Sequence, residues 1–167
     1  MSNIILIGMP GSGKSTLGVL LAKSIGYSFI DSDLIIQKRE GKKLFEIIDE
    51  IGLDGFIRRE EAAVKSIEAD ETVIATGGSV VLSEGAMEHL RKMGSIVYLK
   101  VSPSDLEKRV KNIKTRGIVM EKNETIYDVY KARASLYERY ADITVELCNS
   151  HIEDSVEKIM NLLNTEV

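Results

Sequence analysis

The sequence is poor in the residues that build disulfide bonds and metal clusters. Among its 167 residues there is one cysteine, Cys148, and there are two histidines. One cysteine cannot form a disulfide within the chain, which suits a reducing compartment. One cysteine and two histidines are also too few for a typical zinc cluster. We therefore expect a cytoplasmic protein in which Cys148 packs as a small apolar side chain.

Long apolar runs and an excess of basic charge are also absent. No run approaches the roughly 20 residues of a membrane-spanning helix, and the first residues lack the basic segment and apolar core of a leader peptide. The net charge of −4 and the isoelectric point near 5.3 differ from those of a typical nucleic-acid-binding protein. We expect a monomeric single domain over 1–167 whose partner is a small molecule, not a nucleic acid or a membrane.

What the sequence does contain is a phosphate-binding loop near its N-terminus. Residues 8–15 read Gly-Met-Pro-Gly-Ser-Gly-Lys-Ser, which fits the P-loop pattern G-x-x-x-x-G-K-[ST]. An apolar, β-branched run over 3–7 precedes this loop and predicts a strand. A helix is predicted to follow from Ser15 to Ile25 and to end at Gly26. The loop therefore stands between a strand and a helix, the context in which it binds phosphate.

Each part of the loop has a physical role in binding a nucleotide. The glycines allow backbone angles at which successive N–H groups point inward and form an anion nest, and the positive end of the following helix adds to it. Lys14 supplies a mobile charge for the β- and γ-phosphates, and the Ser15 hydroxyl is a ligand for Mg²⁺. The nucleotide-binding residues predicted in the loop are Gly11, Ser12, Gly13, Lys14, Ser15 and Thr16.

The rest of the chain alternates between strands and helices. The apolar pattern predicts further strands over 27–30, 72–76, 96–101 and 143–147. It predicts further helices over 34–40, 44–51, 54–69, 83–93, 103–112, 125–140 and 152–163. Residues 112–124 are polar and are interpreted as a loop. A strand followed by a helix, five times, predicts an α/β fold of three layers, with a five-stranded parallel sheet and helices on both faces.

Three polar segments follow predicted strands and should meet at the carboxyl edge of the sheet, where such folds bind ligands. They are the P-loop, Asp31-Ser32-Asp33 and Gly77-Gly78-Ser79. Beside a nucleotide, Asp31 suits a contact to Mg²⁺ through water, and Asp33 suits the hydroxyl that attacks the phosphate. Two simpler interpretations stay open: the aspartates shape a turn and cap a helix, and the glycine pair is a flexible turn rather than a close approach to a ligand.

Together these segments resemble those of shikimate kinase, a small P-loop kinase with the nucleoside-monophosphate-kinase-like fold. The resemblance covers essentially the whole chain. Besides the P-loop and Asp31-Ser32-Asp33 it includes Gly52…Gly55-Phe56…Glu60-Glu61, Gly77-Gly78 and Arg133-Ala134-Ser135-Leu136-Tyr137. It implies ATP and Mg²⁺ as cofactors, a mobile lid at 112–124 and a substrate-binding region at 33–62. The implied reaction transfers the γ-phosphate of ATP to shikimate, which gives shikimate 3-phosphate.

The resemblance also implies roles for single residues. Asp33 would hold the acceptor hydroxyls and serve as the base, with Lys14 and Arg116 as the other catalytic groups. Arg116 would reach the phosphates from the lid, and Arg109 would stack on adenine. The spacing of Arg116 alone favours a simpler interpretation, an arginine in a solvated loop. The residues that would touch the substrate are Asp33, Gly77, Gly78 and Arg133.

Three positions depart from the family pattern. The family has an arginine that binds the substrate's carboxylate together with the equivalent of Arg133, and this chain has Ile57 in its place. The next residue is Arg58, but its side chain should point about 100° away around the helix. The third glycine of the family's Gly-Gly-Gly is Ser79, and the lid's Arg-Pro is Arg116-Gly117. Isoleucine cannot replace charge-assisted hydrogen bonds. We therefore expect weak affinity for shikimate unless Arg58 completes the pair.

Two other functions stay open. One is a kinase of the same family that acts on a different small hydroxy acid or polyol. The other is a catalytically silent, nucleotide-binding regulatory module, against which the presence of Lys14, Ser15, Asp33 and Arg116 argues. Turnover of ATP with a panel of hydroxylated acids separates both from shikimate phosphorylation.

Overall fold

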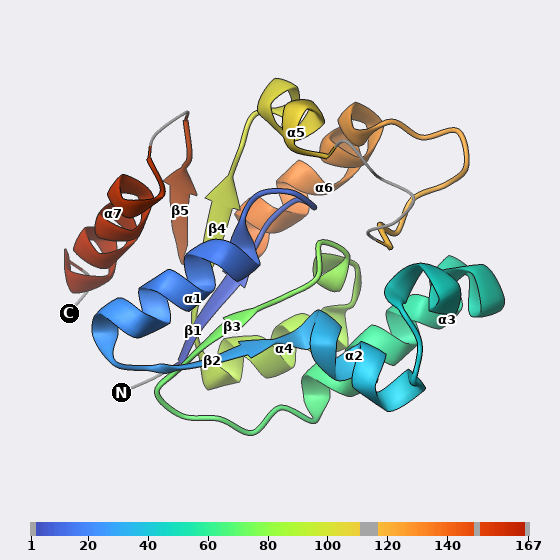
Figure 1. Cartoon of the computed structure of the whole chain (residues 1–167), viewed down its shortest axis with the longest axis horizontal. Helices are drawn as coiled ribbons and strands as arrows, with labels where there is room; N and C mark the ends of the chain where they lie inside the picture. Colours follow the sequence, from blue (N-terminus) through green and yellow to red (C-terminus); the bar gives the residue numbers. More distant parts are fainter. Residues whose placement is uncertain (1–2, 111–116, 149–150, 166–167) are drawn as a thin grey trace.

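The computed structural model describes residues 3–110, 117–148 and 151–165, and a five-stranded sheet forms its centre (Figure 1). The strand order across the sheet is β2-β3-β1-β4-β5, and every neighbouring pair is parallel. This confirms the predicted α/β fold with a parallel sheet. The strands are β1 (Asn3–Ile7), β2 (Ser28–Asp31), β3 (Thr72–Ala75), β4 (Gly94–Lys100) and β5 (Ile143–Glu146).

Helices cover both faces of the sheet, which explains why its inner strands are apolar. In Figure 1, α1 and α7 lie together on one face, and α4 and α6 cover the other. All residues of β1 and β3 are buried, whereas the edge strand β5 alternates buried and exposed residues. The helices are α1 (Lys14–Ile25), α2 (Ser32–Glu40), α3 (Leu44–Lys65), the 3₁₀ turn η1 (Val80–Leu82), α4 (Glu84–Met93), α5 (Pro103–Arg109), α6 (Ile126–Tyr140) and α7 (Ile152–Thr165).

Most helix ends follow the capping residues seen in the sequence. Gly26 ends α1 with a φ of 76°, and its N–H donates to the Ala22 carbonyl. The Ser83 hydroxyl accepts from the Ala86 N–H at the start of α4, and Thr125 starts α6 with a capping box. These local signals set the boundaries because they satisfy backbone groups that a helix end leaves without partners.

The region 44–69 follows its prediction at Gly52 and departs from it at its C-terminal end. The label α3 covers two helices, as expected, and they meet at Gly52, whose φ of 74° and ψ of 177° are not helical. The second of these helices ends at Lys65 rather than near 69, because the Ser66 hydroxyl donates to the Ala63 carbonyl and the chain turns. The turn η1 was not expected, and Cys148 is exposed rather than packed in the core.

The apolar side chains form two clusters. The larger one surrounds the sheet, and the smaller one holds α2 and α3 together beside the carboxyl edge. The members of the smaller cluster are Ile36, Leu44, Ile47, Phe56, Ala63 and Val119. Within the described part of the chain, no helix is long and apolar enough to cross a bilayer.

Candidate active site

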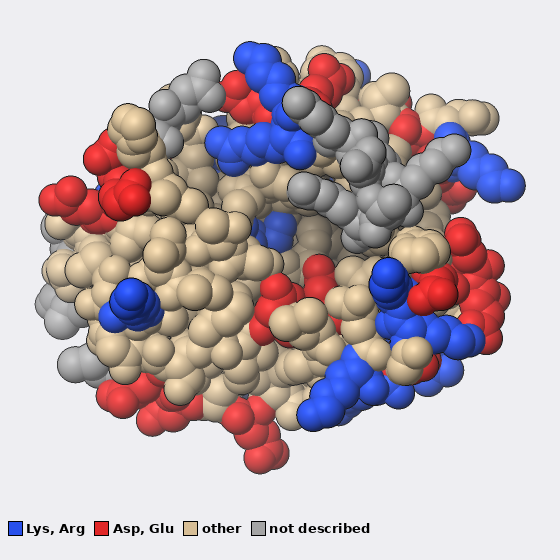
Figure 2. Space-filling view, in the orientation of Figure 1, with Lys and Arg blue, Asp and Glu red and all other residues tan. Residues whose placement is uncertain are grey.

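A cavity of about 440 Å³ opens at the carboxyl edge of the sheet, where Figure 2 shows a hollow near the centre of this face. The P-loop, the ends of β2 and β3, α2, the start of α3, α6 and residues 117–119 form its walls. It therefore lies where the sequence predicted a ligand site. The charged residues that line it are Lys14, Asp31, Asp33, Lys43 and Arg133.

The P-loop has the geometry of an anion-binding turn. Gly11 and Gly13 have φ values of 81° and 96°, in the left-handed region that favours glycine. A Cβ built on Gly11 would lie 2.5 Å from Val110 Cγ2, because the end of α5 packs against the loop. Ser15 and Thr16 follow on α1 and line the cavity, while Ser12 is fully buried inside the turn. The loop's predicted residues are thus brought together around one mouth of the cavity.

The Lys14 ammonium group folds back onto the loop. Its Nζ donates to the carbonyl oxygens of Gly8 at 2.7 Å and Met9 at 2.8 Å. Burial lowers the pKa of Lys14 to about 8, while the carboxylates of Asp33 and Asp31 act in the opposite direction. At neutral pH Lys14 therefore stays largely protonated, and phosphate oxygens can take the place of these two carbonyls.

The Asp31 carboxylate accepts hydrogen bonds from two neighbouring groups. Its Oδ1 accepts from the Asp33 N–H at 2.9 Å and so caps α2, and its Oδ2 accepts from the Ser15 hydroxyl at 2.6 Å. The capping interpretation is thus correct, and it does not exclude the metal interpretation. Among the described residues no group of three or more histidine, cysteine or acidic side chains could hold a metal alone. A hydroxyl beside a carboxylate nevertheless fits Mg²⁺, which binds proteins through few oxygens and keeps water and phosphate ligands.

Asp33 lines the same cavity as Lys14. Burial raises the pKa of Asp33 to about 6, the charge of Asp31 raises it further, and that of Lys14 lowers it. The Asp33 Oδ1 is directed at the backbone of Gly77, since a Cβ there would lie 2.9 Å from this oxygen. The glycine at 77 therefore permits a close approach between the backbone and this carboxylate, while contact of the glycine pair with a ligand stays a prediction.

Glu60 belongs to this region, and the sequence interpretation included it in the resemblance without giving it a role. It is fully buried on α3, its Oε2 accepts from the Ser79 hydroxyl at 2.6 Å, and its Oε1 has no partner within the described residues. Burial raises the pKa of Glu60 to about 7, although the Ser79 hydrogen bond and the charge of Arg133 lower it. Phe56, Glu60 and Val64 are spaced four residues apart and share one face of α3. A carboxylate on an otherwise apolar helix face could have indicated a functional role from the sequence alone.

Arg133 reaches the cavity from α6 and is only 5% exposed. One terminal nitrogen, Nη2, donates to the carbonyl oxygen of Val119, and the other, Nη1, has no partner in the described parts of the chain. One turn later on α6, the Tyr137 hydroxyl donates to the Gly78 carbonyl at 2.5 Å. This hydrogen bond holds α6 against the Gly77-Gly78 segment and so positions the part of the helix that carries Arg133.

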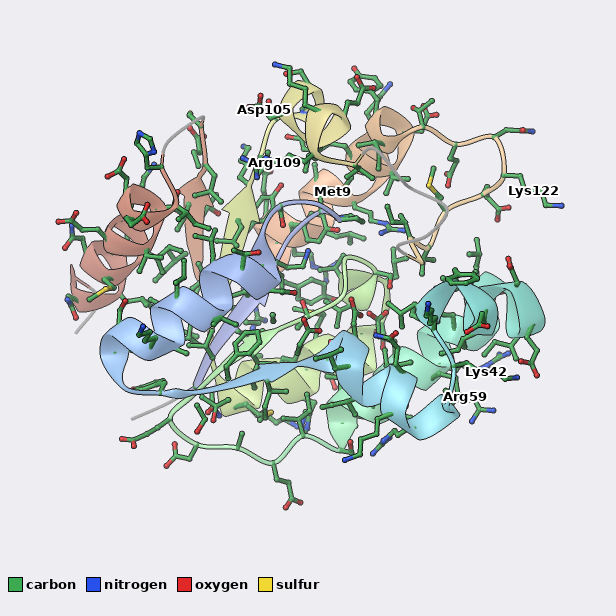
Figure 3. The ribbon with its side chains drawn as sticks, in the orientation of Figure 1. Met9, Lys42, Arg59, Asp105, Arg109 and Lys122 are labelled. Atoms are coloured by element: carbon green, nitrogen blue, oxygen red, sulfur yellow. The ribbon has the colours of Figure 1, made fainter. Side chains whose placement is uncertain are left out.

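The remaining predicted residues lie in different places. Arg109 is exposed beside the P-loop, with its Nη1 3.5 Å from the Ser12 carbonyl (Figure 3). Arg116 lies outside the described residues. Arg58 is exposed and does not line the cavity, so it does not take the place of the family's arginine. Ile57 instead faces a neighbouring cavity of about 530 Å³, which Arg133 also borders.

The described part of 112–124 forms one wall of the main cavity. Gly117 has a φ of 63°, and a Cβ built on it would lie 2.3 Å from Leu44 Cβ. Val119 is 5% exposed and joins the small cluster of α2 and α3. This segment therefore has apolar contacts that its polar composition did not predict, while its motion as a lid stays a prediction. Other lining residues, to which the sequence interpretation assigned no individual role, are Leu34, Gln37, Lys43 and Phe56, all within the predicted substrate-binding region 33–62.

Comparison with known proteins gives one consistent result. The Shikimate kinase family, SKI, matches residues 10–164. The chain is 39% identical to the shikimate kinase of Thiobacillus denitrificans, over 90% of this chain and 84% of that one, and 38% identical to that of Clostridium botulinum strain 657, over 96% and 95%. Its fold matches "Shikimate kinase from Acinetobacter baumannii in complex with shikimate" with a TM-score of 0.91 and 30% identity, over 99% of this chain and 94% of that one. The chain therefore belongs to the shikimate kinase family and is a phosphotransferase with an alcohol group as acceptor.

Proposed function

We propose that this chain transfers the γ-phosphate of ATP to a hydroxyl group of shikimate and uses Mg²⁺ to do so. The observation that carries the proposal is that Lys14 and Asp33 both line one cavity at the carboxyl edge of the sheet, where their charges act on each other. The first can bind the phosphate that moves, and the second can bind the hydroxyl that attacks it. Phosphoryl transfer needs these two groups in one enclosed space.

The chain's own residues supply most of the chemistry. The P-loop N–H groups and Lys14 would bind the phosphates and stabilise the charge on the transferring group. Asp33 would accept a hydrogen bond from the acceptor hydroxyl and take its proton, which requires the carboxylate form. Ser15 and Asp31 would hold Mg²⁺, Asp31 through water, and the ion would neutralise phosphate charge when bound. Arg109 would contact the adenine from its place beside the loop.

The acceptor would lie between α2, α3 and α6. Its carboxylate would pair with Nη1 of Arg133, a buried donor without a hydrogen-bond partner among the described residues. Gly77 and Gly78 line the cavity and would contact the ring through their backbone. A solved relative with 30% identity and a TM-score of 0.91 is described as being in complex with shikimate, which supports shikimate as the acceptor.

A second candidate is another small hydroxy acid, and the position of Ile57 favours it. The arginine that the family places there is replaced by an apolar side chain next to the second cavity. An acceptor with an apolar substituent beside its carboxylate would fill that space better than shikimate does.

Release of ADP, measured with ATP, Mg²⁺ and a panel of hydroxylated acids, separates the two candidates. We expect shikimate to give the highest kcat/KM of the panel. A higher value with another acid would assign the acceptor to the second candidate, and ATP binding without turnover on any acid would leave a regulatory module. Action in the cytoplasm and a monomeric state remain predictions, and light scattering on the purified chain tests the second of these.

A further inference from the structure

The buried carboxylate of Glu60 has fewer partners than such a group requires. It is fully buried, and only one of its oxygens, Oε2, has a hydrogen-bond partner in the described residues, the hydroxyl of Ser79. The other oxygen, Oε1, faces the Gly77 backbone, where a Cβ would lie 2.3 Å from it. A buried carboxylate is costly unless it is paired, so the Ser79 bond is the contact that fixes the orientation of this group.

Helix geometry explains why this carboxylate lacks a charged partner. Positions 57 and 60 are three residues apart on α3, and side chains with this spacing are neighbours on a helix surface. An arginine at 57, as the family pattern has it, could reach both Glu60 and the space beside Arg133. Ile57 does border that space, because it lines the second cavity together with Arg133, but it offers no donor to Glu60.

Four groups from different elements act on the Glu60 carboxylate. The Ser79 hydroxyl comes from the segment after β3, Asp33 from α2, Arg133 from α6 and Lys14 from α1. The cations Arg133 and Lys14 attract it, and Asp33 repels it. The Glu60 charge in turn attracts the Arg133 guanidinium group, whose Nη1 has no hydrogen-bond partner among the described residues.

We infer that Ser79 is a positioning residue for the acceptor: its hydroxyl holds the Glu60 carboxylate against the Gly77 backbone at the cavity wall and so replaces the orienting contact that an arginine at position 57 would supply. The two departures from the family pattern, Ile57 and Ser79, are then one coupled change around Glu60. The inference deepens the proposed function and rests on it, because Arg133 is taken to bind the acceptor's carboxylate.

The test is a double-mutant cycle between positions 79 and 57. The four proteins are the natural chain, Ser79→Ala, Ile57→Arg and the double variant, with KM for shikimate, KM for ATP and kcat measured for each. We expect Ser79→Ala in the natural chain to raise KM for shikimate about three- to tenfold, the effect of one hydrogen bond. The KM for ATP and kcat should change less than twofold. In the Ile57→Arg background the same substitution should change every constant less than twofold, because the arginine then pairs with Glu60.

Ser83 provides a matched control. Its hydroxyl donates to Glu61 Oε2 at 2.6 Å, the same kind of bond between the same two segments, but outside the cavity lining. Ser83→Ala should lower the melting temperature, since Ser83 also caps α4, and leave the KM for shikimate unchanged. If Ser79→Ala behaves like Ser83→Ala, or raises KM equally in both backgrounds, the inference is overturned.

Failure of the proposed function has a different signature. If the natural chain does not turn over shikimate, the acceptor is wrong, and the cycle is run with the acid that the panel identifies. The unfolding free energies of the four proteins need no acceptor at all. They should be non-additive, with a smaller loss from Ser79→Ala when arginine is present at 57, and additivity there contradicts the inference whatever the acceptor is.

Discussion

Replacing Gly117 should disturb the wall of the acceptor cavity more than it disturbs the fold. The backbone at 117 has a φ of 63°, and a side-chain carbon there would lie 2.3 Å from Leu44 Cβ and 2.9 Å from the Phe45 backbone nitrogen. Alanine at 117 would therefore require a shift of this segment away from α3. Proline, the residue that the family has at this position, is restricted to a φ near −65° and cannot adopt the observed backbone at all.

The expected size of the effect follows from the backbone strain. A left-handed conformation costs a non-glycine residue about 1–2 kcal/mol, and the contact with Leu44 adds to this. If the catalytic complex requires residues 117–119 against α3, the kcat/KM for the acceptor should fall about 5- to 30-fold at least, since 1.36 kcal/mol corresponds to a factor of ten. Steady-state kinetics on Gly117→Ala and Gly117→Pro measure this.

Gly26 supplies the control for strain alone. Its φ of 76° is similar, but a Cβ built on it meets no atom within 4 Å. Gly26 caps the C-terminal end of α1, the end away from the P-loop. Gly26→Ala should lower the unfolding free energy by about 1 kcal/mol and leave the kinetics unchanged. If both Gly117 variants stay within twofold of the natural kcat/KM, the contact between this segment and α3 has no role in the catalytic complex.

Three further predictions concern charged groups of the site. Lys14→Ala should lower kcat by about 10²- to 10³-fold with an unchanged circular dichroism spectrum, and near-normal turnover would refute its role. The kcat/KM should fall about tenfold per pH unit below about 6, because Asp33 must be ionised to accept a proton and its pKa is raised to about 6. Asp33→Asn should abolish this limb together with most of kcat, whereas a loss confined to ATP affinity would place Asp33 in the metal site. Glu60 has a pKa of about 7 in the folded protein, against 4.5 for a free glutamate side chain, so the folded state binds its proton more tightly than the unfolded state does. The unfolding free energy should therefore fall by up to roughly 3 kcal/mol as the pH rises from 4.5 to about 7. Chemical denaturation should show that Glu60→Gln flattens this trend, and an unchanged slope would contradict the assignment.

The parts of the structure that could be predicted depend on local sequence. The P-loop and the caps at Gly26, Ser83 and Thr125 each arise from a few adjacent residues, and the alternation of strands and helices predicted the parallel sheet but not the order of its strands. The ligand edge was predictable for the same reason, because parallel strands all end at one side of the sheet. The break between two helices at Gly52 was predictable in the same way, because the glycine that causes it is visible in the sequence. Local reasoning failed at the C-terminal end of α3, which stops at Lys65 rather than near 69.

The contacts that could not be predicted join residues far apart in the chain. The bond between Glu60 and Ser79 and the contact between Gly117 and Leu44 depend on how α3 lies against two other segments. The sequence also could not show whether Arg58 reaches the cavity. Successive side chains on a helix point in directions about 100° apart, and Arg58 is exposed although its neighbour Ile57 borders a cavity.

The most direct test of the proposed reaction follows phosphorus itself. Phosphorus NMR on a mixture of the chain, ATP, Mg²⁺ and shikimate should show a new phosphomonoester signal that grows in equal amount with ADP, and Lys14→Ala should suppress both signals. ADP that appears with inorganic phosphate and without the phosphomonoester, or a phosphomonoester that forms only when another hydroxy acid replaces shikimate, would contradict the proposal that shikimate is the acceptor.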